Sequence, residues 1–363
     1  MGTHTKVFNT HSEYQAFISS GITYWPNVSV CEDNYDLHVN DNGTIVNPSG
    51  ETPTPPTPSG YSSQYLTFVM LENGSISTNF EDVYCSIDGE NWVTSIDDLQ
   101  EGDNVLVKGN LRIPSDSCYA IFDVSGRHNI EGNIMSVYDE TGFRTRTTFD
   151  NSGDTLTYFF SSDYDLISAE NLVLPVTSLT SYCYNGMFYY CSNLTTAPSI
   201  LPATTLANYC YYYMFYGCTS LTTAPELPAT TLANSCYSYM FEGCTSLTTA
   251  PSILPATTLA EDCYSHMFEG CTSLVTAPEL PATTLASYCY AYMFYGCEYL
   301  MTITCLATDI SEFGCTSNWV ANVGGGSGFS PEVHIFTKAA SMTDWELESP
   351  DGIPYGWSVQ DAS

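Results

Sequence analysis

Cys210-Tyr-Tyr-Tyr-Met-Phe-Tyr-Gly-Cys218-Thr-Ser-Leu-Thr-Thr-Ala-Pro-Glu-Leu-Pro-Ala-Thr-Thr-Leu-Ala is one of five copies of a unit that fill residues 181–297. The copies begin 27, 26, 27 and 26 residues apart, at Cys183, Cys210, Cys236, Cys263 and Cys289. A fixed period of about 20–50 residues is typical of proteins in which each repeat stacks on the next. Because one coil of this size cannot bury its apolar side chains alone, we predict a solenoid whose copies share a core.

Within each copy, the spacing predicts a helix followed by a short strand. Thr204-Thr205 offers hydroxyls for a helix N-cap, residues 206–216 carry apolar side chains at helical spacing, and Gly217 suits the end of a helix. Residues 221–227 are rich in threonine and interrupted by proline, which favours a brief strand. The predicted fold class is therefore an α/β solenoid.

Both ends of the array depart from the repeat. Phe159-Phe160 aligns with the Met-Phe pair of the copies, but the repeat cysteines are missing there and Asp163 takes the place of the second one. Beyond the fifth copy the pattern drifts into a partial sixth, and Trp319, Trp345 and Trp357 follow. We expect these tryptophans to close the open end of the core.

The repeat unit A-x-x-C-Y-x-x-M-F-x-G-C-x-x-L-x-x-A-P resembles that of the BspA-like leucine-rich repeats, which occur on gut and oral bacterial surfaces and in phages of gut Bacteroidales. The likeness covers roughly residues 156–310, and the first copy departs from it at Tyr190, where the others carry glycine. Residues 353–357 also resemble the tail that follows such arrays. The resemblance implies a right-handed leucine-rich solenoid used for adhesion rather than catalysis.

Composition divides the remaining chain. Residues 48–60 are rich in proline and should form an extended spacer. Residues 61–150 alternate between apolar and polar positions, with a hairpin signal at Asp88-Gly89, and predict a small antiparallel β domain. The predicted organisation is an N-terminal anchoring segment at 1–47, a Pro-rich linker at 48–60, a β-rich domain at 61–150, a leucine-rich repeat solenoid at 151–310 (a capping coil, five copies and a partial sixth), and a C-terminal cap at 311–363.

About 47 residues with one predicted helix cannot bury much core, so we expect the first segment to dock onto a larger partner or onto copies of itself. Residues 7–38 are similar to N-terminal segments of virion proteins of crAss-like phages. That resemblance implies attachment to the capsid or to other virion proteins. The anchoring candidates are Val7, Phe8, Tyr14, Phe17, Trp25 and Pro26.

The chain is strongly acidic, with a formal net charge of -33, and no Lys or Arg occurs between Thr147 and Thr337. Because nothing there neutralises phosphates, we do not expect the solenoid to bind nucleic acid. We expect the acidity to keep a Tyr-rich repeat soluble; calcium bridging is the alternative, although no EF-hand loop supports it.

The sequence also lacks targeting signals that would place the protein in or across a membrane. No apolar run approaches the roughly 18 residues of a membrane span, and no secretory signal opens the chain. We therefore expect no membrane insertion, and a product that leaves the host cytoplasm by lysis as part of a virion.

We expect no enzyme, no cofactor and no metal site. Ten of the 15 cysteines lie in the repeats, where buried reduced thiols are the favoured interpretation; disulfides or metal ions between coils are the alternative. The six histidines are scattered outside any catalytic motif. His266 occupies a position that holds tyrosine in other copies, which we interpret as a substitution within the repeat.

Comparison of the copies shows where a binding surface could lie. The strand side is nearly constant, whereas the exterior of the predicted helix varies and is rich in tyrosine, which offers rigid apolar area with a polar group. Relaxed selection on a solvated face is the equal alternative. The recognition candidates are Tyr209, Tyr212, Tyr213, Tyr216, Tyr239, Glu242, Tyr288, Tyr292 and Tyr295.

Taken together, these features predict a structural appendage of a phage virion. We expect a head fibre or capsid decoration in which residues 1–47 contact the particle and the solenoid is displayed for adhesion to a host-surface glycan, mucus or protein. A tail fibre is a variant of this prediction, and a BspA-like bacterial surface or prophage-encoded interaction protein is the alternative. We expect a homo-oligomer, although no coiled-coil heptads are present to drive assembly.

Overall fold

The computed structural model describes backbone and side chains of residues 64–80, 82–111, 121–150, 156–324 and 334–362. Elsewhere it describes only the backbone of six short strands: β1 (Lys6–Phe8), β2 (Val28–Val30), β3 (His38–Val39), β4 (Ile45–Val46), β10 (Ile113–Pro114) and β13 (Asp154–Thr155). The chain forms two compact units, residues 1–59 and 60–363.

In the first unit, β1 pairs in parallel with β2, and β3 pairs antiparallel with β4. Val7 and Phe8 belong to β1, where only the backbone is described. The other anchoring candidates, Tyr14, Phe17, Trp25 and Pro26, lie outside the described residues.

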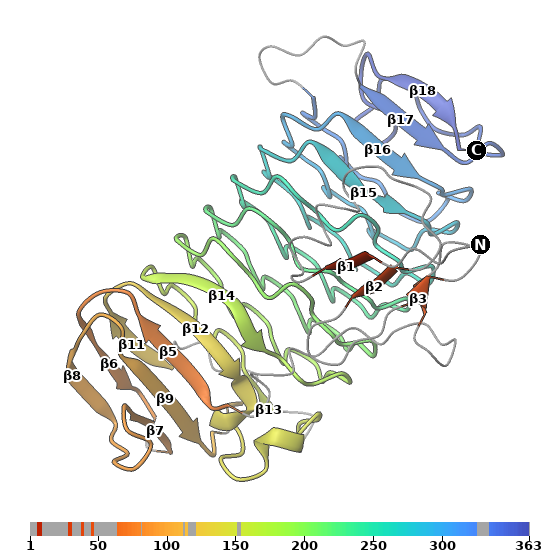
Figure 1. Ribbon diagram of the computed structural model, residues 1–363. Coiled ribbons are helices and arrows are strands. Elements are labelled where there is room, and N and C mark those ends of the chain that lie inside the picture. The colour runs from red at the N-terminus through yellow and green to blue at the C-terminus, as the bar shows by residue number, and fades with distance from the viewer. Residues whose placement is uncertain are drawn as a thin grey trace. The chain divides into compact units, whose positions relative to one another are not determined.

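The second unit begins with two β-sheets (Figure 1). Their strands follow the orders β14-β12-β5-β9-β7 and β11-β6-β8. The pairs are antiparallel, in agreement with the alternating sequence, except that β12 and β14 run parallel. The strands are β5 (Leu66–Met70), β6 (Gly74–Thr78), β7 (Val83–Ser86), β8 (Ser95–Leu99), β9 (Asn104–Gly109), β11 (Phe122–Ser125), β12 (His128–Asn133) and β14 (Leu166–Val173). Since β14 belongs to the first coil, the β-rich region and the coils share one sheet.

From Leu156 onward the backbone winds into coils that lie side by side (Figure 1). Parallel bridges join equivalent residues of successive copies, such as Ile200 with Glu226 and Thr223 with Thr249. The last coils continue into a four-stranded parallel sheet in the order β15-β16-β17-β18. Its strands are β15 (Thr276–Leu280), β16 (Thr302–Cys305), β17 (Ile335–Lys338) and β18 (Ser358–Asp361). Each copy therefore stacks on the next, as the fixed period predicts.

The helix predicted at residues 206–216 is wrong. The described residues contain no α-helix, only the 3-10 turns η1 (Ile134–Val137) and η2 (Phe143–Thr145). None of the helical segments in the part of the chain that the structure describes is long and apolar enough to cross a membrane. The fold is therefore built from strands and turns, and the α/β class does not hold for the described residues.

In residues 209–217, the backbone N–H groups alternate between acceptors in the same copy and acceptors in the next copy. The N–H of Met214 donates to the carbonyl oxygen of Tyr211, three residues earlier, whereas the N–H of Tyr213 donates to Ser238 in the next copy. A left-handed backbone recurs every four residues, with φ of 59° at Tyr209, 58° at Tyr213 and 69° at Gly217. An α-helix does not contain such residues. Because four-residue turns and a helix of 3.6 residues per turn give similar apolar spacing over nine residues, the sequence pattern fitted both.

The core consists of side-chain ladders that run through all the copies. Rings at one position stack at centroid distances of 5.6–6.1 Å, and those at a second position at 5.2–5.8 Å. Burying one such ring stabilises the fold by about 1.5–3 kcal/mol. The two ladders are Tyr184, Tyr211, Tyr237, Tyr264 and Tyr290, and Phe188, Phe215, Phe241, Phe268 and Phe294.

The repeat cysteines are part of this core, and their predicted burial is confirmed. The thiol of Cys218 donates to the carbonyl oxygen of Phe188 at 3.1 Å, and the thiol of Cys244 donates to Phe215 at 3.1 Å. Burial raises the pKa of the Cys210 thiol to about 12. Such thiols stay protonated at neutral pH and act as small apolar groups, and the second cysteine of each copy also satisfies a carbonyl of the preceding coil.

Aromatic side chains close the C-terminal end, as predicted for Trp319 and Trp345. Trp319 is fully buried, stacks on Trp345 at 5.3 Å and donates its indole N–H to the carbonyl of Gly352. Trp357 is only partly buried and lies against His334, with ring centroids 5.2 Å apart. The cap thus supplies the large apolar area that a further copy would have contributed.

At the other end, Asp163 ties the first coil to β12. Its Oδ2 lies 3.2 Å from Nε2 of the fully buried His128, as an ion pair rather than a well-aligned hydrogen bond. Burial lowers the pKa of His128, but Asp163, the Gly126 carbonyl and the charge of Asp165 outweigh it, and the pKa is raised overall. The residue that replaces the second repeat cysteine therefore joins the coils to the β-rich region.

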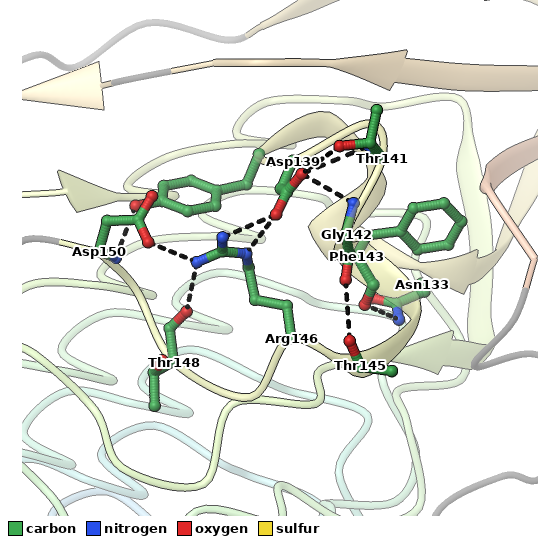
Figure 2. A network of polar contacts seen from close by, with 10 residues as sticks. Asn133, Asp139, Thr141, Gly142, Phe143, Thr145, Arg146, Thr148 and Asp150 are labelled. Atoms are coloured by element: carbon green, nitrogen blue, oxygen red, sulfur yellow. Dashed lines mark hydrogen bonds and ion pairs between the residues drawn. The ribbon is translucent and has the colours of Figure 1, made fainter.

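Arg146 organises the segment that follows η1 (Figure 2). Its Nε and Nη2 lie 2.8 and 2.7 Å from Oδ2 of Asp139, and its Nη1 donates to Asp150 at 2.6 Å. Oδ1 of Asp139 accepts the N–H of Gly142 at 2.8 Å. Burial acts to raise the pKa of Asp139, but the Gly142 and Arg146 contacts lower it overall. This arginine therefore has a structural role.

Candidate functional site

One position of the repeat carries an aromatic ring in four successive copies: Tyr213, Tyr239, His266 and Tyr292. We name these four residues the aromatic row. Their ring centroids lie 4.9, 4.2 and 4.6 Å apart, and the last two pairs are parallel within 8°. All four side chains are partly exposed. At the far end, Nδ2 of Asn318 donates to the hydroxyl of Tyr292 at 3.2 Å. The row is a continuous strip of rings across four coils.

The backbone fixes the position of these rings. Each residue of the row has a left-handed φ between 55° and 58°. That conformation costs roughly 1–2 kcal/mol for a residue with a side chain. It is held by bonds to the next coil: the N–H of His266 donates to Ala291 and that of Tyr292 to Ser317, both at 2.8 Å. Stacking on both faces holds His266 further, so the row is preorganised.

More tyrosines extend the row in the second copy. Tyr212 contacts Tyr213 with ring centroids 4.1 Å apart, Tyr216 contacts Tyr213 at 5.2 Å, and Tyr209 contacts Tyr212 at 5.5 Å. With Tyr239, these residues form one connected aromatic surface. Every one of them is partly exposed, as a binding surface requires.

The remaining recognition candidates are distributed less evenly. Tyr295 contacts Tyr292 at 5.7 Å and lies at the far end of the row. Tyr288 instead contacts Phe313 at 5.3 Å, and among the described residues no ring contact joins it to the row. Phe313 is 73% exposed. The structure therefore groups most of the predicted tyrosines and leaves Tyr288 beside a separate apolar group.

Three phenols of this surface, those of Tyr212, Tyr216 and Tyr239, remain protonated at neutral pH. Desolvation, followed by the neighbouring Tyr213, Glu242, Glu269 and Asp262, raises the pKa of Tyr239 to about 12. Desolvation also raises the pKa of Tyr212 and of Tyr216. The surface can thus offer apolar ring edges together with hydroxyl donors and acceptors.

An acidic group interrupts the aromatic surface. Glu242 and Glu269 fill a repeat position that is Tyr216 and Tyr295 in the flanking copies, and both lie beside His266. One ligand atom from each of the three residues lies within 4.8 Å of those of the other two. Desolvation and the charge of Glu269 raise the pKa of Glu242 to about 7, although His266 and the nearby Tyr216 oppose this shift.

The variation between copies points to Glu242 as a recognition candidate but does not by itself connect this residue with His266 or Glu269. Each repeat position was compared by itself, whereas the structure brings together two positions from adjacent copies. The sequence does contain a pattern that indicates this group. Two neighbouring copies carry Glu242 and Glu269 where the flanking copies carry tyrosine, and the second of them also carries His266 in place of tyrosine.

A half-open hollow of about 430 Å³ lies between β11 and the first coil. Phe122, Phe159 and Phe160 form its apolar part, and Asp123, Asp163 and Asp165 contribute carboxylates. Asp163 is already paired with His128. The hollow therefore lies at the junction that supports the fold.

Comparison with known proteins gives one distant structural likeness. The chain is similar to a leucine-rich repeat protein from Bacteroides ovatus ATCC 8483, with 15% sequence identity and a TM-score of 0.32. The match covers 56% of this chain and 53% of that protein, so it spans about half of each. No protein-family model matches the chain, and no curated protein matches it significantly.

Proposed function

We propose that this chain is a display protein whose coils present the tyrosine-rich surface around the aromatic row to an external partner. The continuous row of partly exposed, stacked rings carries this proposal. Surface aromatics that the backbone and their neighbours hold in place lose little conformational entropy on binding. The repeated array adds several such groups along one surface, so weak contacts can act together.

A carbohydrate is the partner class that this chemistry favours. Partly exposed tyrosine rings can pack against the C–H groups of sugars, and their hydroxyls can hydrogen-bond to sugar hydroxyls. The absence of Lys and Arg between residues 147 and 337 argues against a polyphosphate partner, because no guanidinium or ammonium group there would pair with it. We assign the chain no catalytic role.

A binding experiment on the full chain tests the surface. Tyr209, Tyr212, Tyr213 and Tyr216 would be changed together to serine, with Tyr355→Ser as a control at an 81% exposed tyrosine outside the coils. We expect glycan-array and host-cell binding to fall at least about tenfold for the first variant and to stay unchanged for the control. Equal binding by both, with unchanged circular dichroism, would refute the proposal.

The same proposal includes a location. We infer that the protein is a phage virion appendage, a head fibre or capsid decoration, which contacts the capsid or another virion protein through residues 1–47. Support comes from the resemblance of residues 7–38 to phage virion segments and of the repeat unit to arrays found in phages. A tail fibre is a variant, and a bacterial surface or prophage-encoded interaction protein of the BspA-like type is the competing assignment.

Labelled antibody on intact particles separates these assignments. Labelling of heads supports the appendage, labelling of tails supports the variant, and protein that stays free of particles overturns the location without affecting the tyrosine surface. Light scattering on the full chain and on residues 60–363, which form a compact unit, tests the expected homo-oligomer. Loss of assembly in the shorter chain would assign it to the first segment.

A further inference from the structure

The group formed by Glu242, His266 and Glu269 has the composition of a metal site. It combines one imidazole and two carboxylates, donors that zinc and other first-row divalent ions accept and that calcium, which prefers oxygen alone, suits less well. The ligand atoms lie within 4.8 Å of one another. Around a tetrahedral zinc, donors at about 2.0–2.2 Å from the ion lie roughly 3.3–3.6 Å apart, so a modest rotation of the glutamate side chains closes the site.

One carboxylate oxygen of Glu242 is available to bind an ion. Its Oε2 is buried and has no hydrogen-bond partner among the described residues. Leaving a buried acceptor without a partner is unfavourable. No Lys or Arg occurs in residues 147–337 to neutralise it, and the neighbouring Glu269 has the same charge. The position is therefore suited to a cation that the sequence itself does not supply.

His266 is held in the orientation that a ligand needs. Its ring lies between Tyr239 at 4.2 Å and Tyr292 at 4.6 Å, nearly parallel to both, and its Nδ1 is in hydrogen-bond contact with Oε2 of Glu269. A metal ligand held in place by neighbouring groups loses little entropy when the ion binds.

The repeat provides an internal comparison for these residues. The copies on either side keep Tyr213 and Tyr216, or Tyr292 and Tyr295, at the same two positions. The backbone conformation does not change, since φ is 58° at Tyr213, 57° at His266 and 55° at Tyr292. The three ligand-type side chains therefore replace tyrosines without altering the scaffold, and they do so only where two adjacent copies bring them into contact.

We propose that Glu242, His266 and Glu269 bind one divalent transition-metal ion, with zinc as the expected ion, and that this ion joins two adjacent coils. On binding, the proton between His266 and Glu269 passes to solvent and the ion takes its place. Three protein ligands leave a further position for water or for an oxygen atom of a partner. The proposal is independent of the function of the tyrosine surface.

Metal binding to the untagged full chain, previously dialysed against a chelator, tests this site. Zn²⁺ uptake would be measured by equilibrium dialysis and calorimetry, and Co²⁺ would be added as a spectroscopic probe. His266→Tyr and Glu269→Gln remove ligands; the first restores the residue that neighbouring copies carry and should fold normally. Glu279→Gln removes one exposed carboxylate from β15 and serves as the charge-matched control.

We expect one equivalent of Zn²⁺ per chain, affinity reduced at least about tenfold in both ligand variants, and no change in the control. The Co²⁺ spectrum should show nitrogen and oxygen coordination without thiolate charge-transfer absorption. Three results would overturn the proposal: no saturable uptake, equal affinity in His266→Tyr and the unsubstituted protein, or a Co²⁺ spectrum that reports cysteine ligands.

Discussion

Replacing Gly186 with alanine should destabilise the coils more than replacing Gly243 with alanine. The two glycines occupy different positions of the same turn-rich region. Both have a left-handed φ, 59° and 72°. Alanine costs roughly 1–2 kcal/mol in that conformation. At Gly243 the new Cβ would lie 3.8 Å from its nearest neighbour, Cα of Gly217, which is ordinary contact. We therefore expect a loss of about 1–2 kcal/mol in the free energy of unfolding for Gly243→Ala.

Gly186 differs because a ring lies over it. A Cβ there would be 2.4 Å from Cε1 and 2.6 Å from Cδ1 of Tyr158. Ordinary carbon contacts are about 3.5–4.0 Å, so the ring must move by about 1 Å. Tyr158 also meets Tyr189 edge-on, with centroids 5.5 Å apart. Losing such a pair costs about 0.5–1.5 kcal/mol, which brings the expected total for Gly186→Ala to about 1.5–3.5 kcal/mol.

Urea unfolding followed by far-UV circular dichroism measures both losses, with equal m-values as the check that the same surface unfolds. The double variant Gly186→Ala with Tyr158→Ala should be more stable than the sum of the single losses predicts, because the clash disappears with the ring. Equal losses at Gly186 and Gly243, or strict additivity in the double variant, would refute the reasoning.

Three further results are expected. The repeat thiols, whose pKa burial raises (to about 12 at Cys210), should resist iodoacetamide at pH 8 in the folded chain and react in urea, as peptide mass spectrometry would show; rapid labelling of the folded protein would contradict the buried ladder. The raised pKa of His128 means that its ion pair with Asp163 stabilises the fold fully below about pH 6.5 and is lost as the pH rises through that pKa. The free energy of unfolding should therefore fall more steeply above that pH than in Asp163→Asn, and parallel pH curves would argue against the pair. Phe241→Ala should cost about 3–5 kcal/mol in urea unfolding, against less than about 0.5 for the exposed Tyr355→Ala, and similar losses would place Phe241 outside the core.

The repeat predicted the stacking and the core, because burial at fixed positions follows from periodicity. Cys210, Tyr211, Met214, Phe215 and Cys218 are all fully buried, in agreement with the predicted shared core. Trp319 and Trp345 were expected to close the end, and they do. These outcomes depend only on which positions are apolar, not on the local backbone conformation.

The local conformation could not be predicted in the same way. A run in which Cys210, Met214 and Cys218 share a face satisfies both a helix and successive four-residue turns. The acceptors of the backbone N–H groups decide between a helix and turns. Half of the N–H groups in the turns donate to a carbonyl of the next copy. That partner is supplied by stacking, so a helical pattern read within one copy lacks the deciding information.

The group of Glu242, His266 and Glu269 also depends on how adjacent copies stack. Glu242 was found because it varies, and His266 was set aside because it varies; considered singly, each is a surface substitution. Register between copies places both beside Glu269. Like charges at adjacent registers of a stacked structure repel one another, as they do across strands. Two adjacent glutamates in a region without Lys or Arg therefore weaken the stack unless something positive lies between them. Desolvation and the charge of Glu269 raise the pKa of Glu242 to about 7, so the pair has a deficit of positive charge whenever both carboxyls ionise. A bound divalent ion removes that deficit and links the two coils, so the departure from the tyrosine pattern is better explained by an added cation than by three independent substitutions.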